Sequence, residues 1–254
     1  MTQEPSSTMS TANLPSEGIR RAYLDVARRL CTLLAEDGFK SRDRIPAEPD
    51  LMKRLGVGRP LLREAIVALQ AGGQLAAKPG TGLFLLDDPR KDWSPAESSA
   101  DLGPSIIEQL ETRLLVECEL VELAAGLITP ADLARLETLV AEMQANDPVD
   151  DPKLGIEFHV TIARASGRKI LAALVEAIFD LRQGPMWKTL RQQMLRPEHY
   201  RRTIADRVAI LQALKAGDGI AAREAMRTMV EVVRYRFFEE QGAVFDNEPA
   251  AERV

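Results

Sequence analysis

Two arginines one helical turn apart, Arg59 and Arg63, could recognise a ligand directly. Residues four apart lie on the same side of a helix, so the spacing predicts that both guanidiniums leave one exposed face. A guanidinium presents forked N–H donors that match a phosphate or the O6 and N7 acceptors of guanine. The pair therefore indicates contact with nucleic acid. A solvated basic face on an ordinary helical hairpin is the alternative.

The surrounding residues predict the elements that would position these arginines. Within residues 45–82, a helix with Leu51 and Leu55 on one face is followed by a turn at Gly56 and a second helix that carries both arginines. A short strand, a glycine-containing tip and another strand come next. Upstream, residues 18–37 have the apolar spacing of a helix that packs behind this hairpin. This order is typical of a winged helix-turn-helix.

The segment resembles the DNA-binding domain of the GntR family of bacterial transcription regulators. The resemblance is carried by Ile45, Pro46, Ala47, Glu48, Leu51, Gly56, Val57, Arg59, Arg63, Glu64, Ala65, Leu69, Lys78, Pro79, Gly80, Thr81, Gly82, Leu83 and Phe84. It implies that Arg59 and Arg63 enter the major groove of DNA, and that Gly80 brings the tip of the wing into the minor groove.

Three further residues complete the predicted DNA-binding site. Lys78 is expected to contact a phosphate, with Thr81 beside it on the wing and Gly58 at the start of the recognition helix. The sequence departs from the family pattern at two positions. Pro49 stands where many members have a DNA-contacting arginine, and Gly58 stands where a serine or threonine usually caps the recognition helix. The operator sequence is therefore not expected to be that of relatives.

The charge distribution fits a DNA partner although the formal net charge is −5. Between Leu51 and Gly80 there are five basic residues and one acidic residue. A basic head on an acidic body favours one orientation on double-stranded DNA and makes binding salt-dependent.

The composition predicts a cytoplasmic protein without a membrane partner. No run of 18 apolar residues occurs, so no membrane span is expected. Residues 1–17 lack the basic start and apolar core of a signal peptide, and their serine, threonine and proline content predicts a disordered arm. Cys31 and Cys118 each fall within a helical apolar pattern, which predicts buried thiols in a reducing compartment.

The fold class predicted is mainly α, with two domains. A winged helix-turn-helix of three helices and a small β wing is expected over residues 18–88, and a proline-containing linker over 89–103. Residues 104–240 have helical periodicity throughout, which predicts an antiparallel all-α bundle of six or seven helices. A flexible tail is expected over residues 241–254.

The second half resembles the FCD effector domain, which identifies the chain as a member of the FadR subgroup of the family. The matching residues are Arg113, Glu117, Glu157, Phe158, His159, Ala163, Ala165, Ser166, Gly167, Ile210 to Ala213, Gly217, Asp218, Ala225, Met226 and Arg227. The resemblance implies that residues 104–240 bind an effector and form a homodimer.

Many FCD domains hold a divalent metal, but the corresponding residues of this chain are poor ligands. The resemblance places Gly155, His159, Arg207 and Met229 at the four ligand positions. A single imidazole cannot hold zinc or a related ion, because such sites need three or more converging donors. We therefore expect no metal and no other cofactor.

Two arginines of the second half, Arg113 and Arg207, lie on the apolar sides of their helices. A buried guanidinium needs an anionic or strongly accepting partner. Each could pair with an internal carboxylate, for instance Glu117 or Glu157. The functional alternative is that they anchor a carboxylate or phosphate effector in place of the metal.

Three other residues complete the predicted effector site. They are His159, which could instead be a hydrogen-bonded interior histidine, and Trp187 and Met229. Together with Met186, Tyr200 and Met226, the last two could line an apolar part of the site or could instead belong to a simple core.

Three functions are compatible with these patterns. The first is a transcription regulator that binds operator DNA as a homodimer and responds to a small, anionic metabolite. The second, an enzyme, is not expected, because no phosphate loop, nucleophile elbow or metal constellation is present. The third is a DNA-binding or interaction module whose bundle has lost ligand sensing. A cavity that encloses Arg207 and His159 would favour the first function, and a solid core the third.

Overall fold

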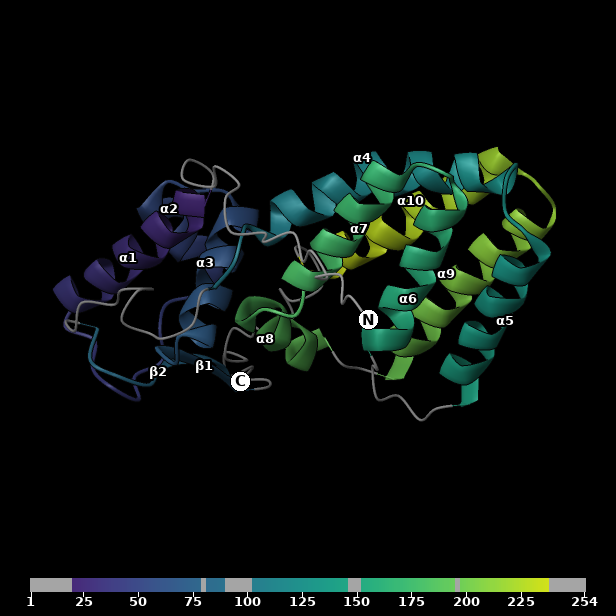
Figure 1. The fold of residues 1–254 in the computed structure, drawn as a ribbon. Helices are drawn as coiled ribbons and strands as arrows, with labels where there is room; N and C mark the ends of the chain where they lie inside the picture. The colour runs from purple at the N-terminus through teal and green to yellow at the C-terminus, as the bar shows by residue number, and fades with distance from the viewer. Residues whose placement is uncertain (1–19, 79–80, 90–101, 146–151, 195–196, 238–254) are drawn as a thin grey trace, which may run out of the picture.

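The computed structural model describes residues 20–78, 81–89, 102–145, 152–194 and 197–237 (Figure 1). The predicted arm at residues 1–17, the tail at 241–254 and most of the linker lie outside these ranges. The elements are α1 (Arg20–Glu36), α2 (Glu48–Leu55), α3 (Arg59–Ala71), β1 (Leu75–Lys78), β2 (Gly82–Leu85), α4 (Ile106–Ala125), α5 (Pro130–Ala145), α6 (Pro152–Ala165), α7 (Lys169–Leu181), α8 (Pro185–Met194), α9 (Pro197–Lys215) and α10 (Gly219–Tyr235).

The N-terminal part is a winged helix-turn-helix, as predicted. Helix α2 ends at Gly56, whose φ of 67° is the left-handed conformation that glycine adopts without a steric penalty. This turn directs the chain into α3, which packs against α1. Strands β1 and β2 form an antiparallel pair with Leu75 opposite Leu85 and Lys78 opposite Gly82. The pair Lys78 and Gly82 is therefore the last of the wing toward its tip.

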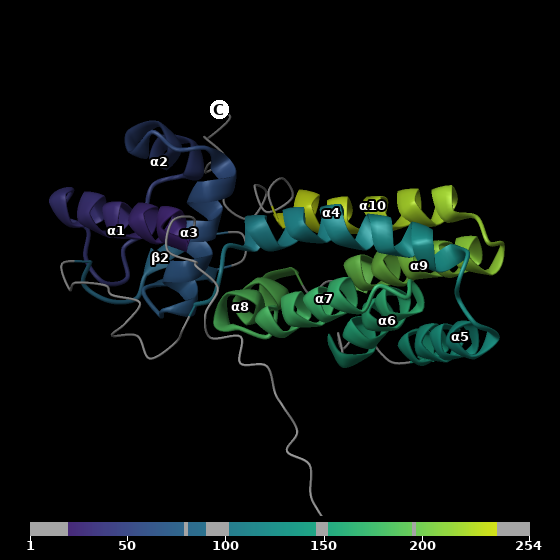
Figure 2. The same ribbon diagram turned by 45° about the horizontal axis from the view of Figure 1, so that its top comes forward.

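The C-terminal part is an antiparallel helical bundle, which confirms the predicted mainly α fold class. Helices α4 and α10 lie side by side in both views, with α9 against them and α5, α6 and α7 completing the bundle (Figures 1 and 2). The start of α5 follows the predicted capping pattern, because Thr129 Oγ1 accepts from the backbone N–H of Asp132 and Asp132 Oδ2 accepts from that of Thr129.

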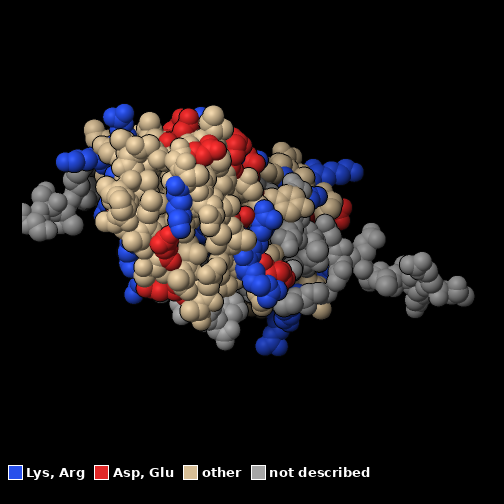
Figure 3. All heavy atoms as spheres, turned by 90° about the vertical axis from the view of Figure 1, so that its right-hand side faces the viewer, with Lys and Arg blue, Asp and Glu red and all other residues tan. Residues whose placement is uncertain are grey.

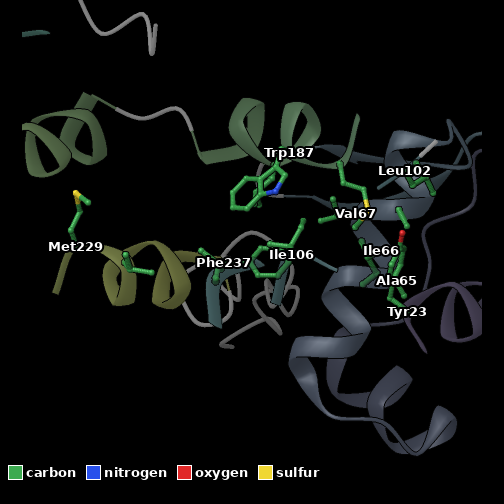
Figure 4. Packing of buried hydrophobic residues seen from close by; sticks show 14 of the residues in the cluster. Tyr23, Ala65, Ile66, Val67, Leu102, Ile106, Trp187, Met229 and Phe237 are labelled. Carbon is green, nitrogen blue, oxygen red and sulfur yellow. The ribbon is translucent and has the colours of Figure 1, made fainter. Parts of the chain in front are cut away.

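The two parts share one hydrophobic core. Tyr23 and Val67 of the winged domain belong to the same buried cluster as Ile106, Trp187 and Phe237 of the bundle (Figure 4). Helix α8 and the start of α4 both contact α3. The recognition helix consequently lies between the body of its own domain and the bundle, and every residue from Leu62 to Leu69 is buried.

Two further expectations concern burial and membrane contact. Cys31 and Cys118 are free and buried, as predicted. Burial raises the pKa of both thiols to about 11. Among the described helices, none combines the length and apolarity needed to cross a membrane.

Candidate functional site

The first turn of α3 lacks a side-chain cap. Gly58 occupies the N-cap position in an extended conformation, and no side chain accepts from the free N–H groups of this turn. Arg59 follows as the first helical residue and is half-buried, while Pro60 is exposed. The unoccupied N–H donors and the guanidinium of Arg59 are available together at this helix end, where the helix dipole favours a negative charge.

Arg63 does not leave the exposed face predicted for it. Its side chain is only 3% exposed, and its Nε donates to both carboxylate oxygens of Glu48, at 2.9 and 3.0 Å. Its Nη1 donates to the backbone carbonyl of Phe237 at 3.2 Å. The spacing correctly predicted that Arg59 and Arg63 lie one turn apart on the same helix. The bundle, however, packs over the side of α3 that carries Arg63. The expectation of two exposed arginines is therefore wrong for Arg63 in this arrangement.

The wing presents the two predicted residues that lie within the described ranges. Lys78 and Thr81 are both exposed, and the Thr81 hydroxyl donates to the carbonyl of Lys78 at 3.1 Å. The ammonium of Lys78 lies 4.4 Å above the ring of Phe84, which holds the lysine at the tip. Gly80 lies outside the described residues. The basic surface is smaller than the charge count suggested, because Arg54 pairs with Asp37 and lowers the pKa of that carboxyl.

The bundle encloses a cavity of about 130 Å³, which brings together all five residues predicted for the effector site. They are Arg113, His159, Trp187, Arg207 and Met229. Tyr200, suggested as part of an apolar lining, also lines the cavity, whereas sequence reasoning missed the rest of the lining, which is Arg182, Leu190, Arg191, His199, Thr203, Val233 and Arg236.

The cavity is strongly cationic. Five arginines line it, and there is no aspartate or glutamate among the described residues of the lining. Arg236 donates to the carbonyl of His199 and to the hydroxyl of Thr203, both at 3.3 Å, and Arg191 donates to the carbonyl of Arg182 at 2.9 Å. These contacts orient the two guanidiniums within the cavity.

One wall of the cavity is a buried group formed by Arg113, Glu117 and His159. Arg113 Nε donates to Glu117 at 2.5 Å. Pairing with an internal carboxylate was one of the two alternatives predicted for Arg113. His159 Nδ1 lies 2.5 Å from the other oxygen of Glu117. All three side chains are 2–3% exposed.

The charges within this group balance at neutral pH. Burial lowers the pKa of His159 to about 4, against the opposing effect of Glu117, so the imidazole is neutral. Burial would raise the pKa of Glu117, but Arg113 and His159 outweigh it and hold that pKa well below its usual range. The carboxylate of Glu117 thus neutralises Arg113 within this wall of the cavity.

Arg207 faces the position of a glycine on the neighbouring helix α6. A Cβ atom built on Gly155 would lie 2.7 Å from Nη2 of Arg207, which is closer than atoms approach without displacement. Gly155 therefore leaves the space that this guanidinium fills. The other suggested partner for Arg207, Glu157, forms an exposed ion pair with Arg135.

Aromatic side chains connect the cavity to the winged domain. The guanidinium of Arg182 lies 5.1 Å from the ring centre of Phe179 and 4.4 Å from that of Trp187. Trp187 Nε1 donates to Gln109 at 2.8 Å, and the amide of Gln109 donates to the carbonyl of Pro104 at 3.0 Å. Trp187 thus contacts both the cavity and the start of α4.

The residues at the family's metal positions do not fit a metal. Gly155 has no donor, Arg207 carries a fixed positive charge, and the thioether of Met229 is a weak ligand for a hard divalent ion. Within the described ranges, no three histidine, cysteine, aspartate or glutamate side chains gather as a metal site would require. The chemistry of this cavity therefore comes from guanidiniums.

Comparison with known families agrees with the two folds. Residues 22–85 match the family described as "Bacterial regulatory proteins, gntR family", and residues 108–232 match the FCD domain. This chain belongs to the GntR family. Its FCD domain places it in the FCD-containing group of these transcriptional regulators.

Named relatives cover nearly the whole chain. The "Putative L-lactate dehydrogenase operon regulatory protein" of Escherichia coli K12 is 30% identical over 87% of this chain and 90% of its own length. The "Exu regulon transcriptional regulator" of the same organism is 28% identical over 89% and 88%, and the "Uxu operon regulator" of Haemophilus influenzae 26% identical over 87% and 84%. Among solved structures, Streptococcus agalactiae GntR is 26% identical, covers 84% of this chain and 98% of its own, and has a TM-score of 0.43. The chain is therefore a DNA-binding transcriptional regulator that senses a metabolite.

Proposed function

We propose that the metabolite is a small anion, a carboxylate or phosphate ester, held by the arginines of the cavity without a metal. The observation that carries the proposal is the lining itself, which holds five arginines and, among the described residues, no aspartate or glutamate. The planar donor pairs of a guanidinium match a carboxylate or phosphate in two parallel hydrogen bonds. The cavity volume of about 130 Å³ suits a small ligand of this class.

The glycine beside Arg207 offers a test of this ligand class. A carboxylate present at about 100 times its Kd should stabilise the wild-type protein by roughly 2.7 kcal/mol, which raises Tm by about 5–10 °C. L-lactate, D-glucuronate, citrate and inorganic phosphate form a suitable panel of anions, with Tm followed by differential scanning fluorimetry. The Gly155→Ala variant should fold normally, because alanine favours a helix and only the end of a flexible side chain must move. It should nevertheless lose most of the anion-induced increase in Tm.

Two comparisons separate ligand binding from general stability. Arg207→Met should abolish the anion-induced increase, whereas Arg201→Met, which removes an exposed arginine of the same helix, should preserve it. Elemental analysis should detect no stoichiometric metal in the purified protein. If no anion raises Tm, or if Gly155→Ala and Arg207→Met respond like the wild type, this cavity does not bind the effector.

We propose further that the regulator acts as a homodimer through helices α4 and α7. Leu115 on α4 is 74% exposed and Ile170 on α7 is 86% exposed, and the two helices are in contact. Leu171, Leu174 and Leu181 extend the apolar surface along α7. Figure 3 shows a broad uncharged surface on the bundle, broken by scattered charged side chains. A two-fold dimer would bury this surface and present two winged domains to paired half-sites.

A charge at Ile170, the most exposed apolar residue of this surface, should separate the subunits. We expect Ile170→Glu to weaken the dimer at least tenfold, because a carboxylate would have to be buried without a partner. Sedimentation velocity across micromolar concentrations measures the effect. Leu86→Glu places the same charge at an exposed leucine of the winged domain and should leave the dimer intact. Equal sedimentation of the two variants would exclude α4 and α7 as the interface.

A further inference from the structure

The bundle covers the recognition helix of its own chain. Helix α3 packs against α1 on one side and against α8 on the other. In Figure 4, Val67 of α3 points toward the region where Trp187 of α8 and Ile106 of α4 converge. Arg63 is enclosed on the same side of α3, between Glu48 and the carbonyl of Phe237. This side of a recognition helix must face the major groove if Arg63 is to reach a base.

Two polar contacts fasten the bundle to α3. The first is the hydrogen bond from Arg63 to the carbonyl of Phe237, directly after α10. The second is made by Glu64, whose carboxylate accepts from the hydroxyl of Ser105 at 3.1 Å and from the backbone N–H of Ile106. Glu64 is 1% exposed, so the recognition helix supplies a buried anionic cap to the first helix of the bundle.

We infer that this arrangement is an autoinhibited, DNA-free state, in which the end of α10, helix α8 and the start of α4 together hold the recognition helix closed against the bundle. We call these contacts the latch. DNA binding requires the latch to open, because duplex DNA and the bundle compete for the same side of α3. The inference rests on the proposed function of the chain as a ligand-responsive regulator and adds the means by which its two domains communicate.

The cavity lies next to both polar contacts of the latch, the one made by Arg63 and the one made by Glu64. Arg236 lines the cavity, and the next residue, Phe237, accepts from Arg63. Trp187 also lines the cavity and is linked through Gln109 to Pro104. Pro104 directly precedes Ser105, whose hydroxyl donates to Glu64. An anion that holds Arg182, Arg191 and Arg236 in place would stabilise α8 and the end of α10 where they meet α3. Binding of the anion is therefore coupled to closure, and it lowers the affinity for DNA.

The burial of Glu64 works against the closed contact. Burial raises the pKa of Glu64 to about 7, and the hydrogen bonds from Ser105 and Ile106 only partly oppose this rise. Glu108 adds a further unfavourable charge nearby. When the domains separate, this carboxylate regains water, and Arg63 becomes available to an acceptor on DNA.

Weakening the latch should strengthen DNA binding in the absence of an anion. The full-length wild-type protein is used to select a duplex from a random pool, and Kd is measured by fluorescence anisotropy. Ser105→Ala removes a hydroxyl that donates to Glu64, and Phe237→Ala removes the buried ring that positions the carbonyl. Each should bind the selected duplex about three- to tenfold more tightly than the wild type, because the open state becomes more populated.

Matched variants control for changes that do not involve the latch. Thr112→Ala removes a hydroxyl of the same helix that donates to Glu108, and Tyr235→Ala removes an exposed ring near the end of α10. Both should bind with the affinity of the wild type. Hydrogen exchange gives a second readout, since duplex binding should accelerate exchange of the Ile106 amide at least tenfold when Glu64 releases it.

The outcomes separate the latch from the proposed function. If the wild type selects no duplex, both are refuted. If it selects one, but Ser105→Ala and Phe237→Ala bind no more tightly than their controls and exchange at Ile106 is unchanged, the latch alone is refuted.

Discussion

Replacing Glu117 with alanine should lower the free energy of unfolding by about 3–5 kcal/mol, because the variant leaves the buried guanidinium of Arg113 without its counter-charge. Arg113 is 2% exposed and its Nε donates to Glu117 at 2.5 Å. The substitution also removes the carboxylate beside the neutral imidazole of His159. In a protein of this size the change should lower Tm by about 6–20 °C.

The matched comparison is Glu157→Ala on helix α6. Glu157 forms an ion pair with Arg135, but both side chains are more than 40% exposed and water screens their interaction. Its removal should change stability by less than about 1 kcal/mol. Chemical denaturation of both variants provides the measurement. A loss of under 1 kcal/mol for Glu117→Ala would mean that the buried group does not organise the bundle.

The second large effect concerns the recognition of DNA. Arg59 is the first residue of α3, next to the uncapped N–H groups at Gly58, and the bundle does not enclose it. Arg59→Ala should cost about 1–3 kcal/mol on the selected duplex, or roughly 5- to 150-fold in Kd, if the guanidinium reads a base edge. Binding to an unrelated duplex should change much less.

Lys78→Ala provides the contrast on the wing. Its ammonium is exposed above Phe84, in a position suited to a phosphate. The variant should weaken binding to all duplexes alike. It should also reduce the slope of log Kd against log salt concentration by about 1, which corresponds to the loss of one phosphate contact. Anisotropy titrations on selected and unrelated duplexes distinguish the two patterns. Equal losses on both duplexes for Arg59→Ala would remove Arg59 from base recognition.

The winged domain was predictable because its signals are local. Apolar spacing predicted α2 and α3, Gly56 marked the turn, and the glycine-containing wing followed in order. The same local spacing failed for Arg63, since it relates residues within one helix and carries no information about what packs against that helix. One buried partner of Arg63, the backbone carbonyl of Phe237, lies 174 residues away in the sequence. A contact of this kind depends on how two domains meet.

The cavity was predictable only in part, for the same reason. Arg113 and Arg207 were found because each interrupts an otherwise apolar helical face. Arg182, Arg191 and Arg236 were missed because they lie at or near helix ends, where a basic residue is commonly solvated. Met186 and Met226, suggested as an apolar lining, are buried in the core and are not part of the cavity wall.

Coupling between the cavity and DNA tests the account most directly. The Kd of the selected duplex should be measured for the wild type and for Gly155→Ala, with and without a saturating concentration of the carboxylate that raises the wild-type Tm most. We predict that the carboxylate weakens wild-type DNA binding by about 5- to 150-fold, and that the variant binds DNA equally well in both conditions. A wild-type affinity that is unchanged or increased by the bound carboxylate would contradict the account.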